Sequence, residues 1–135
     1  MKIVVIDGQG GRLGKTLVEK LHAEIAGAEI YAVGTNSIAA SVMNKAGADF
    51  SATGENPVVV CCRDADVIVG PVGIVIADSL LGEVTPRMAL AVGQSSAEKV
   101  LLPVNRCKNH IVGVADLSVS RLVAEAVEYI RSLAG

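Results

Sequence analysis

Aromatic residues are nearly missing from this chain of 135 residues, which has no tryptophan, one phenylalanine and two tyrosines. Hydrophobic residues still make up 51% of the sequence, so a core has to be built from aliphatic side chains. A chain of this length can bury roughly two-thirds of its unfolded surface as one domain. Aliphatic strands covered by helices on both faces suit such a composition. We therefore expect a single domain over residues 1–135.

A large excess of charge of one sign is missing too, and so are long apolar runs. The formal net charge is −2 and no cluster of Lys or Arg stands out, so the sequence lacks the basic patch that nucleic acid requires. The longest uncharged apolar run, Val67 to Ala77, contains Pro71, and a membrane-spanning helix needs about 20 residues. The first apolar run, Ile3 to Ile6, is too short for a signal peptide. We expect a cytoplasmic protein that binds neither nucleic acid nor membranes.

Potential metal ligands are scarce as well. The chain has three cysteines, Cys61, Cys62 and Cys107, and two histidines, and their spacing matches no zinc site. In a cytoplasmic protein we expect these cysteines to be reduced thiols. We therefore expect no metal site built from cysteine and histidine.

What the sequence does have is a repeated switch between short apolar runs and helical patterns. We expect strands at residues 3–6, 29–33, 48–50, 66–70, 99–104 and 110–114. Helices are expected between them, including a short one near residues 74–81, and the clearest helix is the last, at residues 119–133. Residues 105–109 are too few for a parallel crossover, which needs about a dozen, so the sixth strand should run antiparallel. The pattern predicts a doubly wound, mainly parallel, Rossmann-like α/β sheet with helices on both faces.

Ligands on such sheets bind beyond the carboxyl ends of the strands, where the winding reverses. Several loops rich in glycine or in short polar residues fall at this edge. The candidate cofactor-binding residues are Gly8, Gln9, Gly10, Gly11, Arg12, Leu13, Thr35, Asn36, Gly70, Pro71 and Gly73. Two carboxylates near the same edge, Asp7 and Glu55, are the candidate catalytic residues.

The first of these loops, "DGQGGRLG", lies between a strand and a helix. Gly8 suits a tight turn, Gly10 lets a phosphate approach the backbone, and Gly14 lets helix and strand pack closely. Amides at the helix start would face an anion. The GxGxxxG spacing resembles the GxGGRxG loop of dihydrodipicolinate reductase, an NAD(P)H enzyme. That resemblance covers only the first strand, loop and helix, so the reaction of that enzyme does not carry over.

Two features count against a dinucleotide. The second strand ends in "VGTNS", which has no acidic residue to bind a ribose. Asp7 places a carboxylate at the mouth of the loop, where it would repel phosphate unless Mg²⁺ or a proton intervened. Alternatively, Asp7 accepts hydrogen bonds from the loop's own amides and fixes the turn. The phosphate hypothesis depends on loop amides that remain free. Glu83 is interpreted as a surface residue.

Several segments together resemble a small bacterial family of Rossmann-like proteins known as a domain of unknown function. They are "VIDGQGGRLGKTLVEKL", "AVGTNS", "KAGADFSATGEN", "ADVIVGPVGIVIADSLLGEVTP" and "LPVNRC". The resemblance spans nearly the whole chain. It implies a cytosolic single-domain α/β protein and brings no activity, substrate or site residues.

Three functions remain open from the sequence. The first is a small-molecule binding protein that holds a nucleotide or dinucleotide, NAD or NADP above all, at the glycine loop. The second is an enzyme whose active site is completed in a homo-oligomer, with Asp7 or Glu55 as acid, base or metal ligand. The third is a non-catalytic assembly protein, because so apolar a chain can expose a patch that pairs subunits into a dimer.

Overall fold

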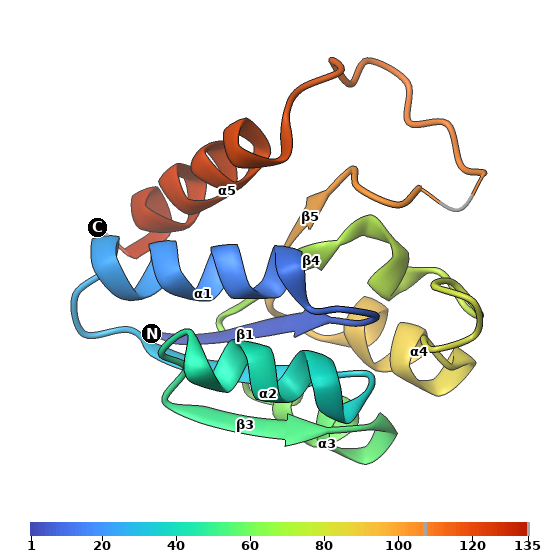
Figure 1. Ribbon diagram of the computed structural model, residues 1–135, viewed down its shortest axis with the longest axis horizontal. Coiled ribbons are helices and arrows are strands. Elements are labelled where there is room, and N and C mark those ends of the chain that lie inside the picture. Colours follow the sequence, from blue (N-terminus) through green and yellow to red (C-terminus); the bar gives the residue numbers. More distant parts are fainter. Residues whose placement is uncertain (107, 135) are drawn as a thin grey trace.

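Five parallel strands form the central sheet of the protein, in the order β3-β2-β1-β4-β5 (Figure 1). The computed structural model describes residues 1–106 and 108–134. The strands are β1 (Lys2–Asp7), β2 (Glu29–Gly34), β3 (Phe50–Thr53), β4 (Val67–Pro71) and β5 (Glu98–Leu102). The winding reverses between β1 and β4, so the predicted doubly wound parallel sheet is confirmed.

Helices cover both faces of this sheet. They are α1 (Arg12–Glu24), α2 (Ser37–Lys45), α3 (Glu55–Cys61), α4 (Pro86–Gln94) and α5 (Val119–Ala134), with a 3₁₀ turn, η1 (Val72–Val75), after β4. Helices α1, α2 and α5 pack on one face, and α3 and α4 pack on the other. The carboxyl ends of all five strands therefore meet at one edge, with helix starts and loops around it.

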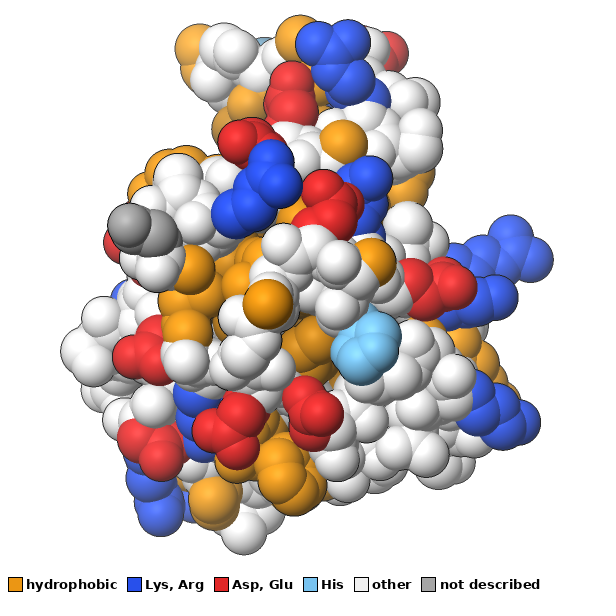
Figure 2. Space-filling model, turned by 90° about the vertical axis from the view of Figure 1, so that its left-hand side faces the viewer, with side chains coloured by type: hydrophobic (Ala, Val, Ile, Leu, Met, Phe, Trp, Pro, Cys, Tyr) orange, Lys and Arg blue, Asp and Glu red, His pale blue; other side chains and the backbone are white. Residues whose placement is uncertain are grey.

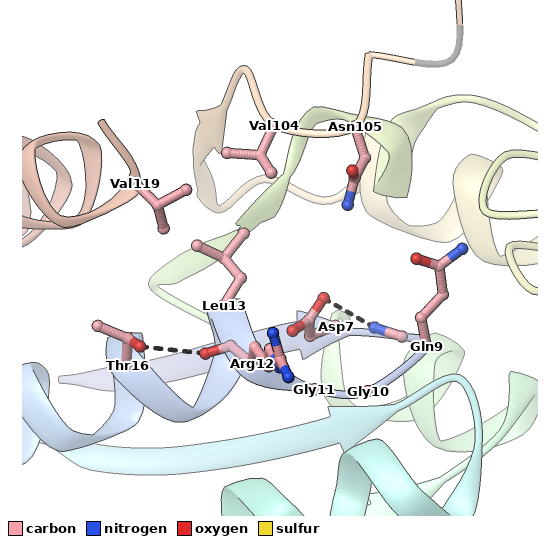
Figure 3. Close-up of a pocket in the computed structure, with 11 residues that line it drawn as sticks. Asp7, Gln9, Gly10, Gly11, Arg12, Leu13, Thr16, Val104, Asn105 and Val119 are labelled. Carbon is pink, nitrogen blue, oxygen red and sulfur yellow. Dashed lines mark hydrogen bonds between the residues drawn. The ribbon is translucent and has the colours of Figure 1, made fainter. Parts of the chain in front are cut away.

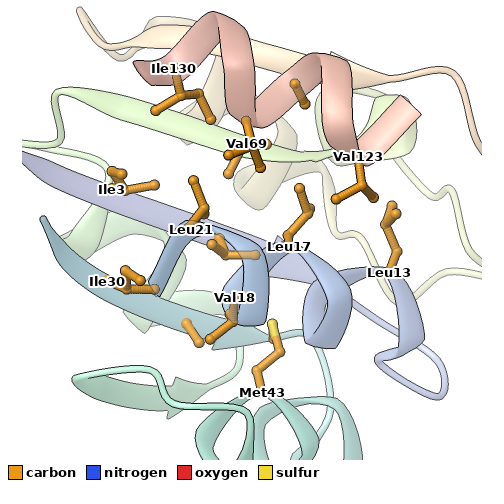
Figure 4. Packing of buried hydrophobic residues seen from close by; sticks show 14 of the residues in the cluster. Ile3, Leu13, Leu17, Val18, Leu21, Ile30, Met43, Val69, Val123 and Ile130 are labelled. Carbon is orange, nitrogen blue, oxygen red and sulfur yellow. The ribbon is translucent and has the colours of Figure 1, made fainter. Parts of the chain in front are cut away.

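The core consists of two aliphatic clusters, one on each face of the sheet. Because side chains alternate along a strand, Ile3 and Val5 of β1 enter one cluster while Val4 and Ile6 enter the other. In the first cluster, α1 contributes a stripe that includes Leu17, which packs between the sheet and α5 (Figure 4). No aromatic side chain belongs to the fully buried core, in keeping with the composition.

Polar side chains cap the starts of two helices. The Asn36 side chain accepts a hydrogen bond from the Ala39 amide, 2.8 Å away, at the start of α2. Thr85 caps α4 in the same way, and Pro86 follows at the first helical position. Gly47, with φ of +115°, ends the turn after α2 in a conformation that favours glycine.

The antiparallel sixth strand predicted at residues 110–114 is wrong. Within the described residues that follow β5, the chain forms no further strand and runs out from the sheet before it returns as α5 (Figure 1). Asn105 and Lys108 have φ of 53° and 62°, left-handed conformations that turn the chain away from the edge of β5. Val112 is consequently 86% exposed rather than part of a sheet. Cys107 lies outside the described residues.

The helix expected near residues 74–81 is also wrong. The chain makes only the short turn η1, after which Asp78, Leu80 and Leu81 adopt positive φ values of 65°, 55° and 57°. A helix cannot continue through such residues. The resulting irregular segment lies at the carboxyl edge of the sheet and brings Glu83 to the glycine loop.

Charged side chains of both signs share the surface (Figure 2). Figure 2 shows acidic and basic side chains mixed over one face, with no field of a single sign. Among the described residues, no helix combines the length and the apolar character needed to cross a membrane.

Candidate functional site

A cavity of about 470 Å³ opens at the carboxyl edge of the sheet, and we call it the glycine-loop cleft. The end of β1, the loop that follows and the start of α1 form its floor, while the chain after β5 and the start of α5 form its opposite wall (Figure 3). Its lining residues are Asp7, Gly8, Gln9, Gly10, Gly11, Arg12, Leu13, Thr16, Val104, Asn105 and Val119. All six candidate residues from Gly8 to Leu13 therefore line one cavity.

The cleft has an apolar end and a polar end. Leu13, Val104 and Val119 point toward one another at one end, and Gln9 and Asn105 point into the gap at the other (Figure 3). Such a mixture is usual in small-molecule sites, where apolar walls enclose a ligand and a few polar groups orient it.

Asp7 fixes the shape of the loop. Its carboxylate accepts hydrogen bonds from the amides of Gly8, at 2.8 Å, and Gly14, at 2.7 Å. The residue is only 5% exposed, and this burial raises the pKa of Asp7 above its ordinary value, although the two amides act in the opposite direction. Of the two roles left open for Asp7, the structure shows the turn-fixing one. The amides of Gly8 and Gly14 are consequently closed to a ligand.

Two more loop amides are occupied by the protein itself. The Gly11 amide donates to the Gly8 carbonyl at 2.9 Å, and the Gln9 amide donates to Glu83 Oε1 at 2.8 Å. The expectation that every amide from Gly8 to Leu13 faces a ligand is therefore wrong. Within the described part of the chain, the amides of Gly10, Arg12 and Leu13 have no acceptor.

The three residues that carry these amides all line the glycine-loop cleft. A Cβ atom added at Gly10 would meet nothing within 4 Å, so the backbone borders open space there. Arg12 and Leu13 begin α1, and the first amides of a helix are left without partners and carry partial positive charge. The Arg12 side chain is exposed beside them. Together they can bind one phosphate or carboxylate group.

The other loop glycines serve packing. A Cβ at Gly14 would lie 2.4 Å from the Met43 sulfur and 2.9 Å from the Asp7 Cβ, which is the close helix-to-strand packing that the sequence predicts. At Gly11, φ is +72° and an added Cβ would come within 2.8 Å of the Ala39 Cα, so the loop rests on α2. Neither position leaves room for a side chain.

Thr35 and Asn36 lie outside the cleft, at the end of β2, and both bind Glu83. The Thr35 hydroxyl donates to Glu83 Oε1 at 2.8 Å, and the Asn36 amide group donates to the same atom at 2.7 Å. Partial burial alone would raise the pKa of Glu83, but hydrogen bonds from Gln9, Thr35 and Asn36 outweigh it and hold that pKa below its ordinary value. Asn36 also donates to the Gln9 carbonyl at 3.0 Å.

Sequence reasoning missed Glu83, because an acidic residue in an irregular segment resembles any surface residue. A signal was available in its neighbours. Leu80 and Val84, which flank it, are apolar and prove to be 4% and 0% exposed, so the segment had to return to the core at the carboxyl edge. The two apolar residues therefore indicated that the segment as a whole stays near the core, although Leu81 within it is 98% exposed.

Gly70, Pro71 and Gly73 do not line the glycine-loop cleft either. A Cβ at Gly70 would lie 2.3 Å from the Ile6 carbonyl oxygen, so this glycine permits close approach of β4 to β1. A Cβ at Gly73 would lie 2.9 Å from the Ser79 hydroxyl. Pro71 is buried as the last residue of β4. The structure thus assigns packing roles to these residues and does not bring them together with Gly10.

The second candidate catalytic carboxylate, Glu55, lies at the start of α3, away from the cleft. It accepts a hydrogen bond from the Thr85 hydroxyl at 2.6 Å and pairs with Arg87 at 3.6 Å, which links α3 to the start of α4. Asp7 and Glu55 therefore do not share a site. Among the described residues, no group of three or more His, Cys, Asp or Glu side chains is placed to hold a metal ion.

Comparisons with known proteins extend the description. The model of the family described as "Domain of unknown function (DUF3842)" matches residues 2–135. No curated protein matches the chain. The crystal structure of a dodecameric FMN-dependent UbiX-like decarboxylase from Escherichia coli O157:H7 is similar with a TM-score of 0.46 and 17% identity, covering 100% of this chain and 94% of that chain.

Proposed function

This chain belongs to the family described as "Domain of unknown function (DUF3842)", and from the geometry of its glycine-loop cleft we propose that it binds a small molecule of the nucleotide class. The phosphate is held by the amides of Gly10, Arg12 and Leu13 and by the Arg12 side chain. The single observation that carries this proposal is that these three amides have no acceptor in the described chain and border an open cavity.

The cleft suits the rest of such a ligand. Small-molecule sites in proteins measure about 300–1,000 Å³, and the volume of about 470 Å³ falls within this range. The apolar end formed by Leu13, Val104 and Val119 can cover a planar base, while the Gln9 side chain offers a polar group for a sugar. Asp7 is the feature that opposes a phosphate, and the amides of Gly8 and Gly14 that donate to its two carboxylate oxygens partly compensate its charge.

NAD or NADP is the nucleotide that the glycine loop predicts from sequence. The position of the loop, after the first strand and before the first helix, supports this proposal. The end of β2 counts against a dinucleotide, since Thr35 and Asn36 already bind Glu83.

The test is a thermal unfolding series with NAD⁺, NADH, NADP⁺, ATP, FMN and sugar phosphates, each at millimolar concentration. A ligand present at about one hundred times its Kd stabilises the folded protein by about 2.7 kcal/mol, which raises Tm by several degrees. We expect at least one nucleotide to do so. We expect Gly10→Leu to abolish the shift while leaving the unliganded Tm nearly unchanged, because the added side chain enters open space in the cleft.

Gly93→Leu is the matched control. Gly93 lies in α4, an added Cβ there also meets nothing within 4 Å, and α4 does not line the cleft. This variant should keep the full ligand-induced shift. The proposal fails if no phosphate-bearing ligand changes the wild-type Tm, or if Gly10→Leu responds as strongly as Gly93→Leu.

Assembly into a homo-oligomer, with a dimer as the simplest form, stays a prediction. The enzyme hypothesis requires it, because a second copy would have to bring a further reactive group to the cleft. Light scattering on the purified chain measures the mass of the particle directly. A monomer would exclude an active site completed between copies.

A further inference from the structure

The glycine loop has two sides, and only one of them is open. A dinucleotide on a doubly wound sheet extends to both sides of the point where the winding reverses, with one ribose held by an acidic residue near the end of the second strand. In this protein the open side faces β5 and α5 and forms the glycine-loop cleft. The other side, toward β2, is where the second half of a dinucleotide would have to lie.

The polar groups on the β2 side are already paired. The Gln9 amide, the Thr35 hydroxyl and the Asn36 amide group donate to one oxygen, Glu83 Oε1, at 2.8, 2.8 and 2.7 Å. A ribose placed here would have to displace these hydrogen bonds to charge. Hydrogen bonds to a charged group are stronger than those between neutral groups, so their displacement opposes binding.

Space on the β2 side is filled as well. A Cβ added at Gly8 would lie 2.4 Å from the Thr35 hydroxyl, 2.9 Å from Glu83 Oε1 and 3.0 Å from Leu80 Cδ1. Gly10, two residues along the same loop, meets nothing within 4 Å. The described lining of the cleft includes Gly8 and Gln9 but neither Thr35, Asn36 nor Glu83.

The segment that carries Glu83 is anchored. The Asp78 amide donates to the Val84 carbonyl at 2.7 Å, and the Val84 amide donates to the Ser79 carbonyl at 3.2 Å, so the segment closes on itself. Leu80 and Val84, at 4% and 0% exposure, fix it to the core. Glu83 is therefore held over Gly8 from both sides.

We propose that Glu83 closes the β2 side of the glycine loop, so that the site accepts a mononucleotide and discriminates against a dinucleotide. This inference rests on the proposed function and specifies the size of its ligand. Glu83 acts here as a specificity-determining residue, through the donors that it occupies and the space that it fills. Its negative charge also repels a second phosphate on that side.

The experiment titrates NAD⁺ and its two halves, nicotinamide mononucleotide and adenosine monophosphate, into the wild type by calorimetry. We expect the tighter-binding half to bind at least as tightly as NAD⁺. In Glu83→Ala we expect the affinity for NAD⁺ to rise about tenfold, the equivalent of one hydrogen bond to a freed donor, with little change for the half that occupies the cleft. Circular dichroism confirms that the variant is folded.

Glu29→Ala is the matched control, because it removes one exposed carboxylate from the opposite end of β2. It should behave as the wild type. NAD⁺ binding about tenfold tighter than both halves would overturn the inference while the proposed nucleotide function stands. An unchanged NAD⁺ affinity in folded Glu83→Ala would overturn the role of Glu83. If the folded wild type binds none of the three, this inference is overturned, while the proposed function is decided separately by the wider ligand series of the thermal unfolding test.

Discussion

The two sides of the glycine loop differ in whether the protein itself provides acceptors for the backbone amides. Toward β2, the protein itself pairs the Gln9 amide with Glu83 and fills the space over Gly8. Toward β5 and α5, the amides of Gly10, Arg12 and Leu13 remain without acceptors beside a cavity. One continuous loop thus has a structural half and a half available for binding. A glycine pattern indicates where the backbone closely approaches other atoms. The surrounding residues determine whether those atoms belong to a ligand or to the protein itself.

The largest difference in stability between the two sides is expected between the variants Gly8→Ala and Gly10→Ala. At Gly8 the methyl group enters filled space, and overpacking of this kind costs about 1–3 kcal/mol of unfolding free energy. At Gly10 the same methyl group meets nothing within 4 Å and should change stability by less than about 0.5 kcal/mol. Urea unfolding measures both values. Equal losses would mean that the two sides are equally filled.

A smaller effect comes from the two carboxylates that hold the loop, because their pKa values shift in opposite directions. Burial raises the pKa of Asp7 above 3.8, so the stability that this group contributes increases as pH falls through the raised pKa. Three hydrogen bonds outweigh burial and lower the pKa of Glu83 below 4.5, so its contribution is present above pH 4.5 and is lost as pH falls through the lowered pKa.

The measurement is the unfolding free energy of Asp7→Asn and Glu83→Gln, each subtracted from the wild type, from neutral pH to about pH 3, which extends well below the ordinary pKa of Glu83. The wild-type advantage over Asp7→Asn should grow toward acid. The advantage over Glu83→Gln, about 1 kcal/mol at neutral pH, should shrink. If the two free-energy differences changed with pH in the same direction, the contrast between the buried Asp7 carboxylate and the Glu83 carboxylate held by hydrogen-bond donors would be contradicted.

The smallest effect on stability is expected at Arg12, on the open side. Its side chain is exposed and has no ion-pair partner in the described chain, so Arg12→Met should change the unfolding free energy by less than about 0.5 kcal/mol. The same variant should weaken nucleotide binding and make it less sensitive to salt, because a cation that contacts phosphate is removed. Lys15→Met is the control, because Lys15 is an exposed cation of the same helix that does not line the cleft. Identical binding by both variants would exclude Arg12 as a phosphate contact.

The sequence was sufficient for the architecture because alternating apolar periods, caps and glycines are local signals. Asn36, Thr85 and Gly47 act where local rules place them. It was not sufficient after β5, where Val112 and its neighbours look like a strand. No edge partner forms there, since left-handed residues direct the chain outward. Apolar character alone does not specify pairing.

For the candidate site, the sequence located the loop but not the use of each amide. Asp7 and Gly14 are seven residues apart, and their hydrogen bond depends on how helix and strand meet. Glu83 reaches Gln9 across 74 residues of sequence, a contact that no local pattern contains. Thr35 and Asn36 were correctly expected at the carboxyl edge, but their partner could be found only in three dimensions.

The wall formed by Val104 and Val119 has a consequence for how the molecule unfolds. These residues begin and end the long excursion between β5 and α5, whereas the facing floor belongs to the first turn after β1. A molecule seated between them would touch the beginning of the polypeptide and its final helix at once. Occupancy would therefore tie α5 to the start of the chain beyond its existing core packing through Val123, Val127 and Ile130, and it would oppose local opening of that helix.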